Sequence, residues 1–122
     1  MIEMLKPSEY YAQGYNCAEA IIKSFNEEFN KDIPVSLGSP MGRGAFSGSL
    51  CGAVNGALMI IGFLYGRDDS TKSNETGAYA RQLMTAVKEK YSTELCRELK
   101  ANKVSCVEII DFSYETLKSI LV

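Results

Sequence analysis

The fold is set by residues 51–66, which read CGAVNGALMIIGFLYG. This stretch is apolar on nearly every side of a helix, and Asn55 is the one amide side chain within it. A helix that is apolar all round belongs to the centre of a helical protein. The apolar run at residues 53–65 spans 13 residues, whereas a membrane-crossing helix needs about 20. The pattern therefore predicts a central buried helix and no association with a membrane.

Amphipathic segments lie on both sides of this stretch. In residues 7–30, apolar side chains recur at steps of three and four, the period of a helix with one apolar face. Gly14 interrupts that segment and predicts a break near residues 14–16. The remaining predicted helices cover residues 71–91, 93–100 and 105–122. Because no alternating run indicates a strand, we predict an all-α single domain, residues 1–122, built as a compact bundle of four to five helices.

A glycine-rich segment, residues 31–50, precedes the central helix and predicts a loop of about 20 residues, a length that is often functional. From Gly44 onwards, glycines recur at every fourth position, which favours the close approach of another backbone. A cofactor cradle at Gly42, Gly44 and Gly52 is the alternative. Packing is favoured over this cradle, because Ser47 stands where a dinucleotide motif needs its third glycine and no predicted strand precedes it.

The composition of the 122 residues excludes several functions. There is no histidine, which removes Ser-His-Asp and Cys-His catalysis, His-ligated zinc and His-ligated haem. The 13 Lys and Arg against 15 Asp and Glu give a net charge of -2, so no nucleic-acid partner is expected. Residues 1–7 lack the apolar core of a secretory leader. We therefore expect a cytoplasmic protein whose thiols are reduced unless they are used.

The four cysteines are the most informative residues, because each follows a signal for the start of a helix. The signals are Asn16 with Glu19 for Cys17, Ser47 or Ser49 for Cys51, Thr93 for Cys96, and Ser105 with Glu108 for Cys106. The first turn of a helix carries unpaired N–H groups and partial positive charge. A thiolate is stabilised there, so we expect lowered thiol pKa values, with Arg43 and Arg97 adding to the positive field.

The spacing of the cysteines restricts the chemistry that they can perform. No Cys-x-x-Cys pair occurs, so there is neither a thioredoxin-like dithiol nor a zinc knuckle. The cysteines act together only where the fold gathers four helix starts in one place. Two of them could then form a disulfide, and four could hold zinc or an iron–sulfur cluster. The alternative is that all four are plain core residues of a non-catalytic module.

One pattern of cysteine- and glycine-containing motifs extends over most of the chain. Its parts are Asn16-Cys17-Ala18, Met41-Gly42-Arg43-Gly44, Cys51-Gly52-Ala53-Val54-Asn55-Gly56-Ala57-Leu58, Cys96-Arg97-Glu98-Leu99 and Cys106. This pattern resembles the C-GCAxxG-C-C family of redox-active proteins, which is named for its motif. One departure is that Leu50 precedes Cys51 and Gly52 follows it, where the family name writes glycine before the second cysteine. The resemblance implies a small helical protein with redox-active cysteines, and it makes an iron–sulfur or other metal centre the alternative to thiol–disulfide exchange.

We therefore expect a thiol-based oxidoreductase or an electron-transfer protein that works with a redox partner protein. Its four cysteines would meet beneath a roof formed by residues 38–50 and would form disulfides or ligate a metal. Cys51 is the favoured nucleophile or anchoring ligand, because it opens the most buried helix, and Cys96 and Cys106 are the expected resolving pair. The alternative is a non-catalytic helical oligomerisation module. Apolar faces that short helices leave uncovered favour a homodimer.

Overall fold

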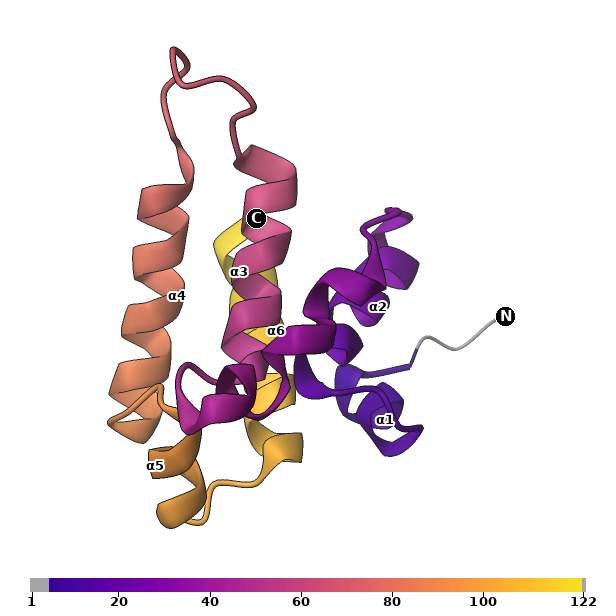
Figure 1. Ribbon diagram of the computed structural model, residues 1–122, viewed down its shortest axis with the longest axis vertical. Coiled ribbons are helices and arrows are strands. Elements are labelled where there is room, and N and C mark those ends of the chain that lie inside the picture. The colour runs from indigo at the N-terminus through magenta and orange to yellow at the C-terminus, as the bar shows by residue number, and fades with distance from the viewer. Residues whose placement is uncertain (1–4, 122) are drawn as a thin grey trace.

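The computed structural model describes residues 5–121, and their fold is all-α, as the sequence predicts (Figure 1). The elements are α1 (Pro7–Ala12), α2 (Cys17–Phe29), η1 (Val35–Met41), η2 (Gly44–Gly48), α3 (Gly52–Tyr65), α4 (Thr76–Tyr91), α5 (Cys96–Ala101) and α6 (Cys106–Leu121). Within the described residues the one β-type pairing is an isolated antiparallel bridge between Leu50 and Leu95. No helix in this part of the chain is long and apolar enough to cross a membrane.

The helix α3 lies at the centre of the fold, which confirms the prediction for residues 51–66. It contacts α2, α4, α6 and η1, and in Figure 1 it runs beside α4 and in front of α6. Five of its apolar residues are almost completely buried: Ala53, Val54, Ala57, Ile60 and Ile61. Its last turns leave the core, where the Phe63 side chain is 51% exposed. The starts of α3, α5 and α6 all lie at the lower end of Figure 1.

The predicted break in the first segment is confirmed. The helix α1 ends at Ala12, and Gly14 adopts a φ of +109°, a conformation open to glycine but not to side-chain-bearing residues. Asn16 then caps α2 by accepting a hydrogen bond from the Glu19 N–H at 2.8 Å, while the Glu19 carboxylate accepts one from the Asn16 N–H at 2.9 Å. This reciprocal pair is the capping box that the sequence predicts, and it makes Cys17 the first residue of α2.

The glycine-rich segment differs from the predicted loop, because it folds into the helical turns η1 and η2. Arg43, Gly44, Ala45 and Phe46 all have positive φ, which makes one left-handed turn. Each non-glycine residue there costs about 1–2 kcal/mol of steric strain, so the surrounding contacts must hold the turn in place. The Gly44 carbonyl accepts two of these contacts, from the Ser49 N–H and from the Ser47 hydroxyl, both at 3.0 Å.

The last three helices follow the sequence prediction with shifted bounds. The helix α4 begins at Thr76 instead of residue 71, because Arg67 donates hydrogen bonds to the Ser70 and Lys72 carbonyls and holds the preceding segment as a loop. The helix α5 begins at Cys96, three residues later than predicted. The predicted end of the last helix at residue 122 and the expectation about a leader at residues 1–4 fall outside the described residues.

Candidate functional site

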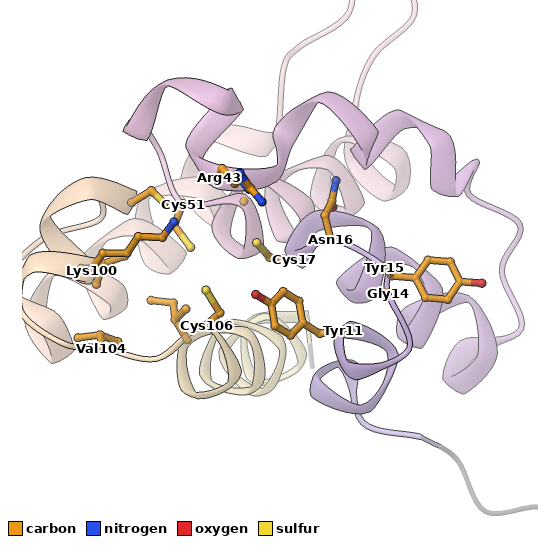
Figure 2. A pocket seen from close by; sticks show the side chains of 14 residues that line it. Tyr11, Gly14, Tyr15, Asn16, Cys17, Arg43, Cys51, Lys100, Val104 and Cys106 are labelled. Carbon is orange, nitrogen blue, oxygen red and sulfur yellow. The ribbon is translucent and has the colours of Figure 1, made fainter.

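All four cysteines line a single cavity of about 500 Å³. Figure 2 shows Cys17, Cys51 and Cys106 turned toward the same opening. The four thiols come from positions 17, 51, 96 and 106, so the fold joins residues that are far apart in the chain. This arrangement is the one that the sequence analysis requires for the cysteines to act together.

The cavity lies where four helices begin. Cys17, Cys96 and Cys106 are the first residues of α2, α5 and α6, and Cys51 stands immediately before α3. The placement of the cysteines at helix starts is therefore confirmed. First-turn N–H groups and the helix dipoles contribute a positive field to the region of the thiols.

Two of the predicted caps are correct and two are wrong. Besides the Asn16 cap, the Ser105 hydroxyl accepts a hydrogen bond from the Glu108 N–H at 3.1 Å. At α3, neither predicted serine takes the N-cap position, which Cys51 itself occupies. At α5 that position belongs to Leu95, whose N–H donates to the Thr93 hydroxyl at 3.1 Å.

A short backbone pairing brings the starts of α3 and α5 together. The Cys51 N–H donates to the Glu94 carbonyl at 3.0 Å, and the Cys96 N–H donates to the Ser49 carbonyl at 2.7 Å. These bonds flank the bridge between Leu50 and Leu95. Sequence reasoning missed this pairing, because a single bridge produces no run of alternating apolar and polar residues.

Asn16 does more than cap α2. Its side-chain amide donates hydrogen bonds to the carbonyls of Gly38 at 3.2 Å and Ser39 at 3.0 Å, and the Ser39 hydroxyl donates to the Glu19 carboxylate at 2.6 Å. These bonds fasten η1 over the start of α2, beside Cys17. The capping box predicts the first role of Asn16, whereas no sequence signal pointed to the second.

The glycines singled out by the sequence allow close packing between chain segments. A Cβ at Gly44 would lie 2.7 Å from the Cys96 Cβ, and one at Gly42 would lie 3.1 Å from the Asn16 Cβ. A Cβ at Gly52 would lie 2.7 Å from the Met41 carbonyl oxygen and 3.1 Å from the Cys17 sulfur. Packing accounts for all three positions. A role for them in holding a cofactor stays a prediction, and of the three only Gly52 lines the cavity.

Among residues 5–121, the charged side chains that line the cavity are those of Arg43 and Lys100, and no Asp or Glu of this range lines it. Arg43 reaches the cavity from the left-handed turn, and Lys100 reaches it from α5 (Figure 2). Arg43 was expected near the thiols from the sequence, whereas Lys100 was not. The other expected cation, Arg97, does not line the cavity and packs against Gly48 instead.

Burial has the largest effect on the pKa values of the two innermost thiols, Cys17 and Cys51, and the predicted fall in pKa is wrong for both. Cys17 and Cys51 are only 9% and 5% exposed. Burial raises the pKa of Cys17, although the Arg43 N–H and its own N–H act in the opposite direction. Burial also raises the pKa of Cys51 to about 11, against a smaller lowering by the Val54 and Ala53 N–H groups. Loss of hydration therefore outweighs the helix start at these two sulfurs.

The two remaining thiols, Cys96 and Cys106, are half-buried. Cys106 lies next to Tyr11, whose hydroxyl points toward it in Figure 2. A hydrogen bond with Cys106, followed by burial, raises the pKa of Tyr11 to about 12. The Tyr11 hydroxyl therefore keeps its proton and can donate it to a hydrogen bond with the Cys106 sulfur. The other tyrosine at the cavity, Tyr15, turns its hydroxyl away from the cysteines.

The thiols also lie within one another's electrostatic field. Charge on Cys106 and on Cys96 would raise the pKa of Cys17, and charge on Cys17 and on Cys96 would raise that of Cys51. Cys17 thus interacts with each of the other three. All four cysteines are free thiols in this structure.

The arrangement does not form a metal-ligand set. Within residues 5–121, no three Cys, Asp or Glu side chains are grouped closely enough to hold a metal ion. Four thiols on one cavity wall are not the tight tetrahedral cluster that zinc requires, nor the cluster of four thiolates that holds iron–sulfur centres. Binding of zinc or an iron–sulfur cluster would require the sulfurs to move closer together, and this alternative to thiol–disulfide exchange stays a prediction.

Comparison with known proteins identifies a family. A family model described as "Putative redox-active protein (C_GCAxxG_C_C)" matches residues 15–120. The chain belongs to this C-GCAxxG-C-C family. The matched range contains all four cysteines and every residue that lines the cavity except Tyr11 and Gly14. No match is found among curated proteins or among solved structures.

Membership agrees with the resemblance read from the sequence. The order of the family motif is kept from Cys17 to Cys106, while Leu50 still stands where the family name writes glycine. The family description states redox activity and names no substrate, partner or cofactor.

Proposed function

We propose that this protein is a thiol–disulfide redox protein that uses the four cysteines of the cavity. The observation that carries the proposal is that four thiols from four separate helix starts line one cavity together with two cations and, within the described residues, no carboxylate. A thiolate attacks a disulfide, and positive charge at the cavity favours that form of sulfur, although burial outweighs this effect at Cys17 and Cys51. Membership in a family described as redox-active supports the same reaction class.

We assign the first attack to Cys106 instead of Cys51. A sulfur that is 5% exposed and has a pKa of about 11 is a poor first nucleophile at neutral pH. Cys106 is half-buried, begins a helix of 16 residues and has the Tyr11 hydroxyl beside it. N–H groups of that first turn and the Tyr11 hydroxyl can stabilise negative charge on its sulfur.

Cys17 is the proposed resolving cysteine. Of the other thiols, Cys106 has the largest electrostatic effect on the pKa of Cys17. The Cys106 thiolate attacks a disulfide R–S–S–R, forms Cys106–S–S–R and releases one RS⁻. The Cys17 thiol loses its proton to solvent, and its sulfur attacks Cys106, forming a Cys17–Cys106 disulfide and releasing the second RS⁻. Two protein thiols are oxidised and one disulfide is reduced to two thiols.

Cys51 and Cys96 form the proposed second pair. The backbone bonds beside the Leu50–Leu95 bridge hold their main chains together, and charge on Cys96 acts on Cys51. Exchange between the two pairs through Cys17, which interacts with all three other thiols, would pass the oxidation inward. Formation of a Cys51–Cys96 disulfide in this way returns Cys17 and Cys106 to thiols, and a second substrate disulfide could then accept two further electrons from them.

The test is limited oxidation of the folded protein with a small disulfide, followed by mass spectrometry of the linked peptides. We expect the Cys17–Cys106 disulfide to appear first. Cys106→Ser should abolish this rapid first step of oxidation, whereas the matched variant Cys51→Ser should keep it. Four thiols that stay reduced and resist alkylation would overturn the proposal and favour the non-catalytic helical module. A first disulfide that excludes Cys106 would overturn the assignment of the attacking residue.

A further inference from the structure

The cavity has the size of a small-molecule site. Its volume of about 500 Å³ falls within the range of about 300–1,000 Å³ that is typical of pockets for small ligands. Cys106, which makes the proposed first attack, is half-buried, and its partner Cys17 is buried, so a disulfide must enter the cavity at least partly to react. A free low-molecular-weight disulfide meets this requirement more easily than a disulfide fixed in the surface of a folded protein.

The charges at the cavity are all of one sign. Arg43 and Lys100 line it, and neither forms an ion pair with a carboxylate of residues 5–121. The lining contains no Asp or Glu from the described part of the chain, although the chain as a whole carries a net charge of -2. The local charge therefore opposes the overall charge of the molecule. Such a local excess attracts anions and raises their rate of encounter.

The position of Arg43 supports a role for its charge. It begins the left-handed turn, with a φ of 54°, and its backbone N–H acts to lower the pKa of the Cys17 thiol, against the larger effect of burial. A non-glycine residue in this conformation costs about 1–2 kcal/mol, so the fold keeps Arg43 at the cavity against a steric cost. Lys100 reaches the same cavity from α5, the helix that begins at Cys96.

We infer that the substrate of the cavity is a small disulfide that carries carboxylate groups, whose charges pair with Arg43 and Lys100 while its sulfurs reach the cysteines. This inference rests on the proposed thiol–disulfide exchange. The carboxylates take no part in the covalent steps. The Cys106 thiolate forms the mixed disulfide, one carboxylate-bearing thiolate leaves, and Cys17 displaces the second. Arg43 and Lys100 position the substrate and speed its capture.

The test compares three disulfides of matched length that differ in charge. They are dithiodiglycolate with two carboxylates, hydroxyethyl disulfide with none, and cystamine with two ammonium groups. Each rate of protein oxidation is divided by the rate of the same disulfide with a neutral reference thiol, N-acetylcysteine amide, to remove intrinsic differences in reactivity. At low ionic strength we expect the normalised rate for dithiodiglycolate to exceed that for cystamine at least tenfold. The preference should shrink as salt is added, because both cations are exposed.

Charge variants locate the effect. Arg43→Gln and Lys100→Gln should each lower the preference several-fold, and the double variant should abolish it. Lys103→Gln is the matched control, because Lys103 follows the same helix α5 but does not line the cavity. Lys100→Gln keeps the inference testable even where Arg43→Gln disturbs the left-handed turn.

The outcomes separate this inference from the proposed function. Equal normalised rates for the three disulfides, or a preference that Lys103→Gln lowers as much as Lys100→Gln does, would overturn the inference and leave thiol–disulfide exchange standing. Failure of all three disulfides to oxidise any cysteine would overturn the proposed function and the inference with it.

Discussion

Replacing Gly56 by Ala would insert a methyl group into the contact between α2 and α3. A Cβ at Gly56 would lie 2.9 Å from the Ala18 carbonyl oxygen, 3.0 Å from the Ala18 Cα and 3.2 Å from the Ile21 Cβ. Two of these atoms are backbone and cannot rotate away. One of the two helices must therefore shift, and these helices carry Cys17 and follow Cys51.

The magnitude follows from two opposing effects. Extra volume forced into a packed contact costs about 1–3 kcal/mol. Replacing Gly by Ala within a helix contributes about 0.5–1 kcal/mol of stability, because the alanine backbone loses less freedom on folding. Gly62 lies on the same helix, and a Cβ there would meet no atom of residues 5–121 within 4 Å outside its own helix backbone and chain neighbours. Gly62→Ala should therefore gain stability without a steric clash. The difference in free energy of unfolding between the two variants then measures the cost of the close contact between α2 and α3.

The assay is urea unfolding of both variants and the unaltered protein. We expect Gly62→Ala to raise the free energy of unfolding by about 0.5–1 kcal/mol, and Gly56→Ala to fall below it by about 1–3 kcal/mol. Alkylation of Cys17 should be faster in Gly56→Ala, because a shifted α2 exposes its first turn. Equal stabilities for the two variants would refute the close approach of α3 to Ala18.

Three further predictions concern the residues around the thiols. Burial raises the pKa of Cys51 from 9.0 to about 11, so between these pH values the folded protein keeps a proton that the unfolded chain releases. The free energy of unfolding must therefore fall as pH rises through that interval, and in urea titrations the fall should be smaller for Cys51→Ala. Asn16→Ala should lower the free energy of unfolding by about 1–2 kcal/mol through loss of the cap, and Asn16→Asp, which keeps the capping oxygen but loses the amide bonds to η1, should lower it less. A Cys51→Ala variant with the same pH slope, or an Asp variant as unstable as the Ala variant, would contradict these two expectations. Tyr11→Phe should slow the reaction of Cys106 with iodoacetamide, whereas Tyr15→Phe, which removes a hydroxyl that points away, should not; equal rates for the two would argue against the hydrogen bond.

The helical class and the central helix could be predicted from the sequence, because both depend on local patterns. Residues 51–66 are apolar all round, and that pattern requires burial wherever the chain goes. The break at Gly14 and the start of α2 at Cys17 were predictable for the same reason. A capping box joins residues three positions apart, so its partners are visible in the sequence.

The left-handed turn and the bridge beside Cys51 could not be predicted. Arg43, Ala45 and Phe46 hold positive φ values that their residue types disfavour, and only the surrounding fold keeps them there. The bridge joins Leu50 to Leu95, and no local pattern marks either residue as its partner. The late start of α4 depends likewise on the loop contacts of Arg67.

The sequence by itself determined that the four cysteines stand at helix starts, because capping and helical period act over three or four residues, although only Asn16 and Ser105 serve as the predicted caps. Only the tertiary structure decided that those starts surround one cavity, that Cys17 and Cys51 are buried and Cys106 is not, and that Lys100 faces them. Hydration of a sulfur depends on every segment packed around it, and those segments come from distant parts of the chain. For this reason burial could reverse the expected pKa shift at Cys17 and Cys51, although their positions at the helix starts were predicted correctly.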